Sequence, residues 1–94
     1  MVTVTDSARE EFNRILETKE LVSGKHLRLA VPPAWTGEGD FGIVIDDGQE
    51  NDQIIDYLGR TVLLVGEDLM EQLQNSVLDF KESTDGPRFT LDVF

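Results

Sequence analysis

The sequence contains no cysteine among its 94 residues. This absence excludes disulfides, thiolate nucleophiles, zinc sites built on cysteine and iron–sulfur clusters held by the chain's own thiolates. A chain of this length has room for one modest hydrophobic core. We therefore expect a single domain over residues 1–94.

Long apolar runs are also missing. No stretch approaches the ~20 apolar residues that a membrane span requires. The opening residues, MVTVTDSARE, do not have the charged-then-apolar pattern of a signal peptide. The sequence therefore predicts a cytoplasmic protein with no membrane partner.

Positive charge is scarce. Eight Lys and Arg face 19 Asp and Glu, which gives a formal net charge of −11. Residues 1–32 hold five acids and five bases, so the whole excess lies in residues 33–94, where the bases are Arg60, Lys81 and Arg88. Phosphate backbones and anionic lipids would be repelled by such a surface. The charge favours a protein partner with a basic patch over nucleic acid or membrane.

Apolar periodicity predicts the first two elements. VTVT alternates as a short strand over 2–5, and one face of a helix over 6–20 collects Ala8, Phe12, Ile15 and Leu16. Thr5, Asp6 and Ser7 are candidate helix caps, and the spacing of Ser7 and Glu10 fits a capping box.

The remaining pattern predicts further short strands, one short helix and a hairpin that turns at Gly59-Arg60. Asn75 is expected to end the short helix. Two helices and about seven strands indicate an α+β domain with a mixed β arrangement, in one sheet or two small ones. The predicted strands are 26–31, 40–46, 53–58, 61–66, 76–83 and 88–94, and the predicted helix is 67–74.

Alternation along the strands predicts which side chains enter the core. The set of strand residues expected to pack on Phe12, Ile15 and Leu16 of the helix is Leu27, Leu29, Val31, Ile43, Ile45, Val62, Leu64, Leu78 and Phe80.

The segment PPAWTGEGDFG, residues 32–42, stands out between two predicted strands because it contains the only tryptophan of the chain. Trp35 is either an exposed anchor for a partner or a lid that folds back on the sheet. Thr36, Glu38 and Asp40 are further partner-binding candidates, and their oxygens could also reach a hard cation.

No catalytic constellation is visible, so we expect no enzymatic activity. His26, the only histidine, begins a strand beside Lys25, and the sequence places no nucleophile or acid next to it. The acidic segment DDGQEND at 46–52 lacks the alternate ligand spacing of an EF-hand calcium loop.

The order of elements and several local matches resemble the A-type iron–sulfur carrier family (HesB/IscA/SufA-like). VTVTDSAREEFNRIL is similar to the opening strand and first helix of that family, with Thr5 and Ala8 at its Thr-x-x-Ala. LRLAV, DFGIVIDD and LDFKESTDGPRFTL resemble later segments of the family, so the likeness covers almost the whole chain. The resemblance implies a HesB-like domain.

The resemblance also indicates where the metal-binding cysteines of the family would fall relative to this sequence. Counted back from Phe41-Gly42, the loop cysteine of the family falls at about Thr36, and its Cys-Gly-Cys pair falls beyond Phe94. A threonine hydroxyl is a poor ligand for soft iron–sulfur centres. We therefore expect no cofactor and no metal site, and a non-enzymatic accessory or partner-binding protein in iron–sulfur cluster or sulfur metabolism. The alternative is binding of iron or another cation through oxygen ligands in residues 36–40.

Overall fold

The computed structural model describes residues 2–19, 21–33, 35–37 and 39–93. In these ranges it contains two helices and seven strands arranged in two sheets. This confirms the predicted α+β class and its number of elements. The radius of gyration of the Cα atoms is 12.7 Å.

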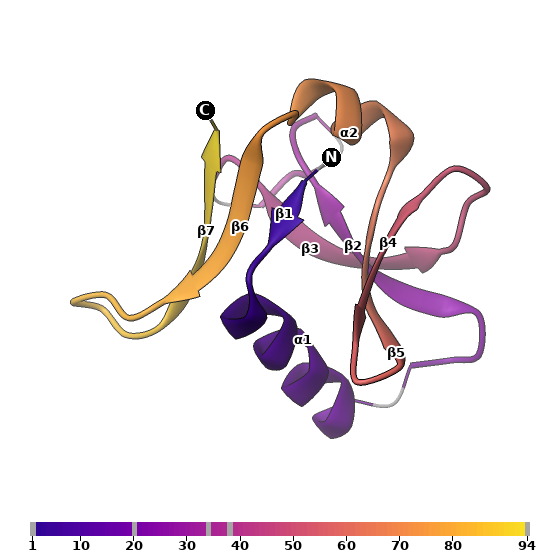
Figure 1. Cartoon of the computed structure of the whole chain (residues 1–94), viewed down its shortest axis with the longest axis horizontal. Coiled ribbons are helices and arrows are strands. Elements are labelled where there is room, and N and C mark those ends of the chain that lie inside the picture. Colours follow the sequence, from indigo (N-terminus) through magenta and orange to yellow (C-terminus); the bar gives the residue numbers. More distant parts are fainter. Residues whose placement is uncertain (1, 20, 34, 38, 94) are drawn as a thin grey trace.

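The smaller sheet joins the two ends of the chain. Its strands are β1 (Thr3–Val4), β6 (Ser76–Lys81) and β7 (Arg88–Val93), in the order β1-β6-β7. β1 is parallel to β6, and β6 forms an antiparallel hairpin with β7. This hairpin extends from one side of the molecule in Figure 1.

The larger sheet has the order β3-β2-β5-β4. Its central strands, β2 (Lys25–Ala30) and β5 (Arg60–Val65), are parallel to each other. The edge strands β3 (Gly42–Asp47) and β4 (Gln53–Tyr57) each pair antiparallel with a central strand. Helix α2 (Glu67–Gln72) connects β5 to the smaller sheet, as Figure 1 shows.

Helix α1 (Asp6–Thr18) packs against β6 of the smaller sheet and against β4 and β5 of the larger one. Its Phe12 ring stacks on Phe89 of β7 with the ring centroids 4.4 Å apart. The core therefore lies between α1 and both sheets.

The N-cap of α1 is Thr5, whose hydroxyl accepts a hydrogen bond from the Ala8 amide. The same hydroxyl donates to the Asp79 carboxylate of β6 at 2.6 Å. The predicted capping box at Ser7 is therefore wrong, because Ser7 already lies inside the helix. Of the three predicted caps, Thr5 is the one used, and Asp79 from a distant strand binds its hydroxyl.

Most of the predicted core is confirmed. Leu27, Leu29, Val62 and Leu78 are buried in one cluster with Phe12 and Leu16. Val31, Ile43, Phe80 and Ile15 are partly buried and pack against that cluster.

Two core predictions are wrong. Ile45 is 52% exposed, since β3 is an edge strand that pairs with β2 on one side. Leu64 is buried but lies outside the core cluster, and it pairs with Arg28 on the opposite face of the sheet.

A β-bulge explains the error at Leu64. The register passes from the pair Ile55 and Leu63 to the pair Asp56 and Thr61 and skips Val62. Neighbours at a bulge lose the strict alternation of a regular strand, and Val62 and Leu63 both join the core cluster. Counting every second residue across the bulge therefore assigns Leu64 to the wrong face.

The β4–β5 turn also differs from the prediction. Leu58 and Gly59, with φ of 51° and 79°, form the two central turn positions, and Arg60 already belongs to β5. Positive φ at both positions is the signature of a type I′ turn, whose twist matches the hairpin. Helix α2 ends at Gln72 with Leu73 as its C-cap, two residues before the predicted end, and Asn75, with φ of 64°, lies in the turn that follows.

Candidate functional site

The loop of residues 32–42 folds back toward the sheet through Trp35. The Trp35 amide donates to the Val31 carbonyl at 3.0 Å, and its side chain is half-buried. The indole ring lies directly against Gly42, the first residue of β3, and against Gly37. A β-carbon at either glycine would overlap the ring. The loop glycines therefore make room for the indole.

The other loop candidates do not pack in this way. Thr36 and Asp40 are exposed, and Glu38 lies outside the described residues. Across the described residues, no group of three or more His, Cys, Asp or Glu side chains is placed to hold a metal ion.

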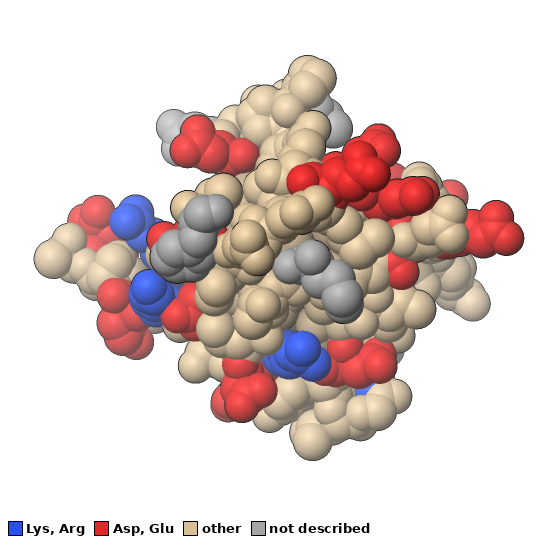
Figure 2. Space-filling view, turned by 45° about the horizontal axis from the view of Figure 1, so that its top comes forward, with Lys and Arg blue, Asp and Glu red and all other residues tan. Residues whose placement is uncertain are grey.

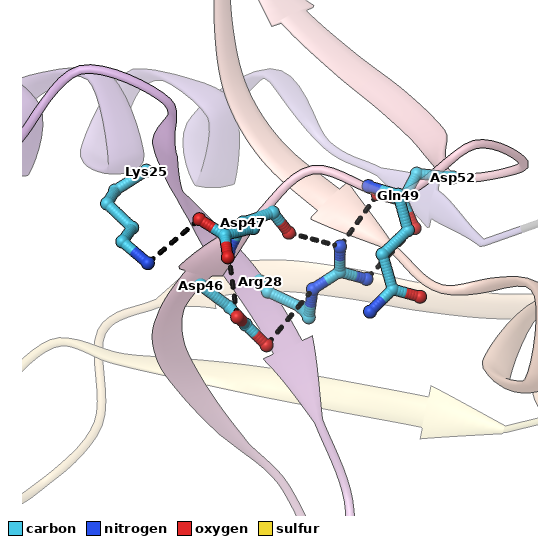
Figure 3. Close-up of polar contacts among 6 residues, drawn as sticks. All are labelled: Lys25, Arg28, Asp46, Asp47, Gln49 and Asp52. Carbon is cyan, nitrogen blue, oxygen red and sulfur yellow. Dashed lines mark hydrogen bonds and ion pairs between the residues drawn. The ribbon is translucent and has the colours of Figure 1, made fainter.

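The site that the sequence did not predict centres on Arg28 of β2 (Figure 3). Its Nη1 donates to Asp52 Oδ1 at 2.9 Å and its Nη2 donates to Asp52 Oδ2 at 2.7 Å. Nη2 also donates to the Asp47 carbonyl at 2.9 Å. The side chains are 10% exposed for Arg28 and 4% exposed for Asp52. This paired geometry is the strong, fork-like form of a charged hydrogen bond.

The loop between β3 and β4 is folded around this pair. The Gln49 amide donates to Asp52 Oδ2 at 2.6 Å, which closes a tight turn. Asp46 Oδ2 lies 4.0 Å from Arg28 Nε, and Lys25 Nζ lies 2.8 Å from Asp47 Oδ1. The charged residues in Figure 3 thus connect β2, β3 and the following loop.

The pair shifts the titration of both partners. The hydrogen bonds from Arg28, together with the backbone bond from Gln49, lower the pKa of Asp52, although burial opposes the shift. The bonds to Asp52 raise the pKa of Arg28. In the same way, the hydrogen bond from Lys25 lowers the pKa of Asp47. All of these groups therefore keep their charges at neutral pH.

Strand alternation placed Arg28 on the outer face of β2, and an outer-face arginine ordinarily lies in water. Here the residue is 8% exposed because the loop around Asp52 folds over it. The partners are 24 positions apart, so no local spacing connects them. The only signal in the sequence was one arginine on a strand and a nearby excess of acids.

Beside Arg28 the surface is hollowed. We call this the β2–α2 hollow; its volume is about 580 Å³. Its polar lining includes Asp46 on the strand side and Glu67 and Asp68 in the first turn of α2. Figure 2 shows acidic side chains spread over the visible face, and the group at the upper right has no basic side chain beside it. The apolar lining is Leu29, Ala30, Val31, Pro32, Pro33, Val44 and Leu69.

Two sheets, one long helix against both of them and a connecting short helix define an α+β fold of the HesB type. The chain is similar in structure to SufA of Escherichia coli, which is described as involved in biosynthesis of iron–sulfur clusters. The TM-score is 0.66 at 20% sequence identity, over 98% of this chain and 84% of SufA.

Two further solved structures share the fold. One is IscA with a [2Fe-2S] cluster, at a TM-score of 0.61 and 22% identity, covering 99% of this chain and 82% of that one. The other is a protein from Aquifex aeolicus solved by NMR, at a TM-score of 0.61 and 24% identity, covering 97% and 89%. The predicted A-type carrier fold is thereby confirmed, on a sequence without cysteine.

Sequence comparisons add no family to this structural likeness. No protein-family model matches the chain. No curated protein matches it either. Neither helix of the described residues is long and apolar enough to cross a membrane.

Proposed function

We propose that the chain is a non-enzymatic accessory protein of iron–sulfur cluster or sulfur metabolism, which acts in the cytoplasm by binding a protein partner. The observation that carries this proposal is the fold of SufA and IscA on a sequence without cysteine. Thr36, which the family resemblance aligns with the ligand of the loop, is exposed and has a hydroxyl in place of a thiolate. The chain therefore has the fold of SufA and IscA but no cysteine thiolate of its own to bind a cluster.

Charge supports the kind of partner. With 19 acidic and 8 basic residues, the surface would attract a basic patch and repel anions. The buried pair of Arg28 and Asp52 supports a non-catalytic role, because the two side chains bond to each other and to the backbone of the loop after β3. A general acid or base needs a free position from which it can reach a substrate.

The test is affinity capture of partners by the whole 94-residue chain from a lysate of its source, at low and at high salt. We expect the captured proteins to belong to iron–sulfur or sulfur metabolism. We also expect their yield to fall as salt rises, since salt screens attraction between exposed charges beyond about 8 Å at physiological ionic strength. A captured set with no connection to these pathways, or the detection of a turnover reaction, would contradict the proposal.

A further inference from the structure

We propose, on the basis of the function above, that the β2–α2 hollow binds a basic segment of the protein partner. The segment carries an apolar side chain between two Lys or Arg side chains. The apolar side chain would enter the hollow, and the two cations would meet the acids on its opposite walls.

The hollow carries an excess of negative charge, although Asp46 lies 4.0 Å from Arg28 Nε. Asp46, Glu67 and Asp68 line it, and the one base in its described lining is Arg28. Arg28 is already neutralised by Asp52, at 2.7 and 2.9 Å. A cation approaching the walls therefore meets carboxylates, while the buried arginine remains bound to its own partner.

The walls of the hollow are held in place. A hydrogen bond of 3.2 Å from Asn51 to Glu67 connects the loop after β3 to the start of α2. The Arg28–Asp52 pair fixes the same loop to β2. Acids on preorganised elements bind a partner with less loss of conformational freedom than acids on a mobile loop.

Size and polarity indicate a short segment. A volume of about 580 Å³ falls within the range of pockets that take small ligands, so it admits a few side chains. Val44, Leu69 and the Pro32–Pro33 pair give the hollow an apolar part. An apolar anchor flanked by charges matches the general design of interfaces, in which apolar centres are surrounded by a polar rim.

A second acidic hollow provides the comparison. It lies along α1 and is lined by Glu10, Glu17 and Glu82, with a volume of about 500 Å³. Arg14 also lines it, with its side chain 61% exposed. Arg14 is paired with Glu11 of the same lining, but its guanidinium stays exposed among the acids of the α1 hollow, whereas the described lining of the β2–α2 hollow contains no exposed base.

The experiment uses the probe peptide acetyl-Lys-Leu-Lys-Leu-Lys-amide, with acetyl-Gln-Leu-Gln-Leu-Gln-amide as its uncharged control. Both are titrated into the isotope-labelled 94-residue chain and followed by amide NMR shifts. The test variant is Asp46→Asn/Glu67→Gln/Asp68→Asn. The matched control, Glu10→Gln/Glu17→Gln/Glu82→Gln, removes the same charge from the α1 hollow. Glu67→Gln/Asp68→Asn alone leaves the neighbourhood of Arg28 intact, in case Asp46→Asn disturbs folding.

We expect the basic peptide to shift the amides of Val44 and Leu69. The test variant should bind it roughly tenfold more weakly, as the loss of several exposed ion pairs implies. The control variant should keep the wild-type affinity to within about twofold, by the same reasoning. The uncharged peptide should bind more weakly than the basic one.

Equal loss in both variants, shifts confined to the α1 hollow, or no binding to the wild type would overturn the inference. Self-association of the chain through the surface at Val44 and Leu69 would also overturn it, because the occupant of the hollow would then be a second copy of the chain.

If the test variant still captures the wild-type set of partners from lysate, the docking site is wrong and the proposed function stands. If the wild type captures no protein of those pathways, the proposed function itself fails.

Discussion

Arg28 and Asp52 form a two-bond ion pair on the face of the larger sheet opposite the core, with both side chains at least nine-tenths buried. The pair fastens the loop after β3 to the central strand β2. Removing one partner of a buried pair leaves the other charge unsatisfied, and this is more costly than removing both.

Asp52→Ala should therefore lower the free energy of unfolding by about 3 kcal/mol or more. The double variant Arg28→Leu/Asp52→Leu should recover much of that loss, because it leaves no buried charge. Urea unfolding of the wild type and both variants measures this. A double variant less stable than Asp52→Ala would contradict this expectation. The pair would then stabilise the fold by more than the cost of burying one unpaired charge.

The same pair predicts how stability depends on pH. Because folding lowers the pKa of Asp52, its contribution is complete above the pKa of an unfolded aspartate, about 3.9, and is lost as the pH falls through the lowered folded value. Asp52→Asn should therefore flatten the acid limb of the stability curve. Unfolding from pH 7 to about pH 2 checks this. If Asp52→Asn leaves the acid limb unchanged, the loss of stability at low pH arises from other carboxylates, such as Asp79.

Thr5 connects α1 to the smaller sheet through its contacts with Ala8 and Asp79. Thr5→Ala should lower the free energy of unfolding by about 0.5–2 kcal/mol, the usual effect of losing an N-cap. Thr5→Ser keeps the hydroxyl and should remain within a few tenths of a kcal/mol of the wild type. Thermal unfolding of the wild type and the two variants distinguishes the contribution of the capping hydroxyl to stability from that of the Thr5 methyl group.

Trp35 reports on its own packing, since it is the only tryptophan of the chain. Gly42→Ala adds a methyl group where the indole lies, so the ring must move toward solvent. The expected result is a red shift of the tryptophan emission and a lower midpoint of unfolding. Thr36→Ala, at an exposed neighbour, is the control and should leave the emission unchanged. An unshifted emission in Gly42→Ala would contradict the packing.

Metal chemistry provides the last prediction. The protein purified without oxygen and supplied with ferrous iron and sulfide should stay colourless, because it has no thiolate to hold a cluster. IscA, whose structure contains a [2Fe-2S] cluster, is the positive control. A stoichiometric protein-bound chromophore would contradict the loss of ligands. A colourless protein that retains iron through gel filtration would instead support the oxygen-ligand alternative for residues 36–40.

The sequence by itself determined the class of fold, the order of the elements and most of the core. These depend on local rules: the apolar face of α1 repeats with the period of a helix, and Leu27 and Leu29 alternate with the period of a strand. The absence of cysteine and the excess of acid are likewise properties of composition, which folding does not alter.

Tertiary structure decided the rest, because those features depend on residues far apart in the chain. Arg28 is buried only because a loop brings Asp52 to it, and Thr5 is the N-cap that Asp79 orients. Leu64 faces away from the core because a bulge at Val62 interrupts the alternation. The β2–α2 hollow exists only where β2, β3 and α2 meet. Each is a contact between separate elements, and periodicity within one element carries no information about which residues will meet.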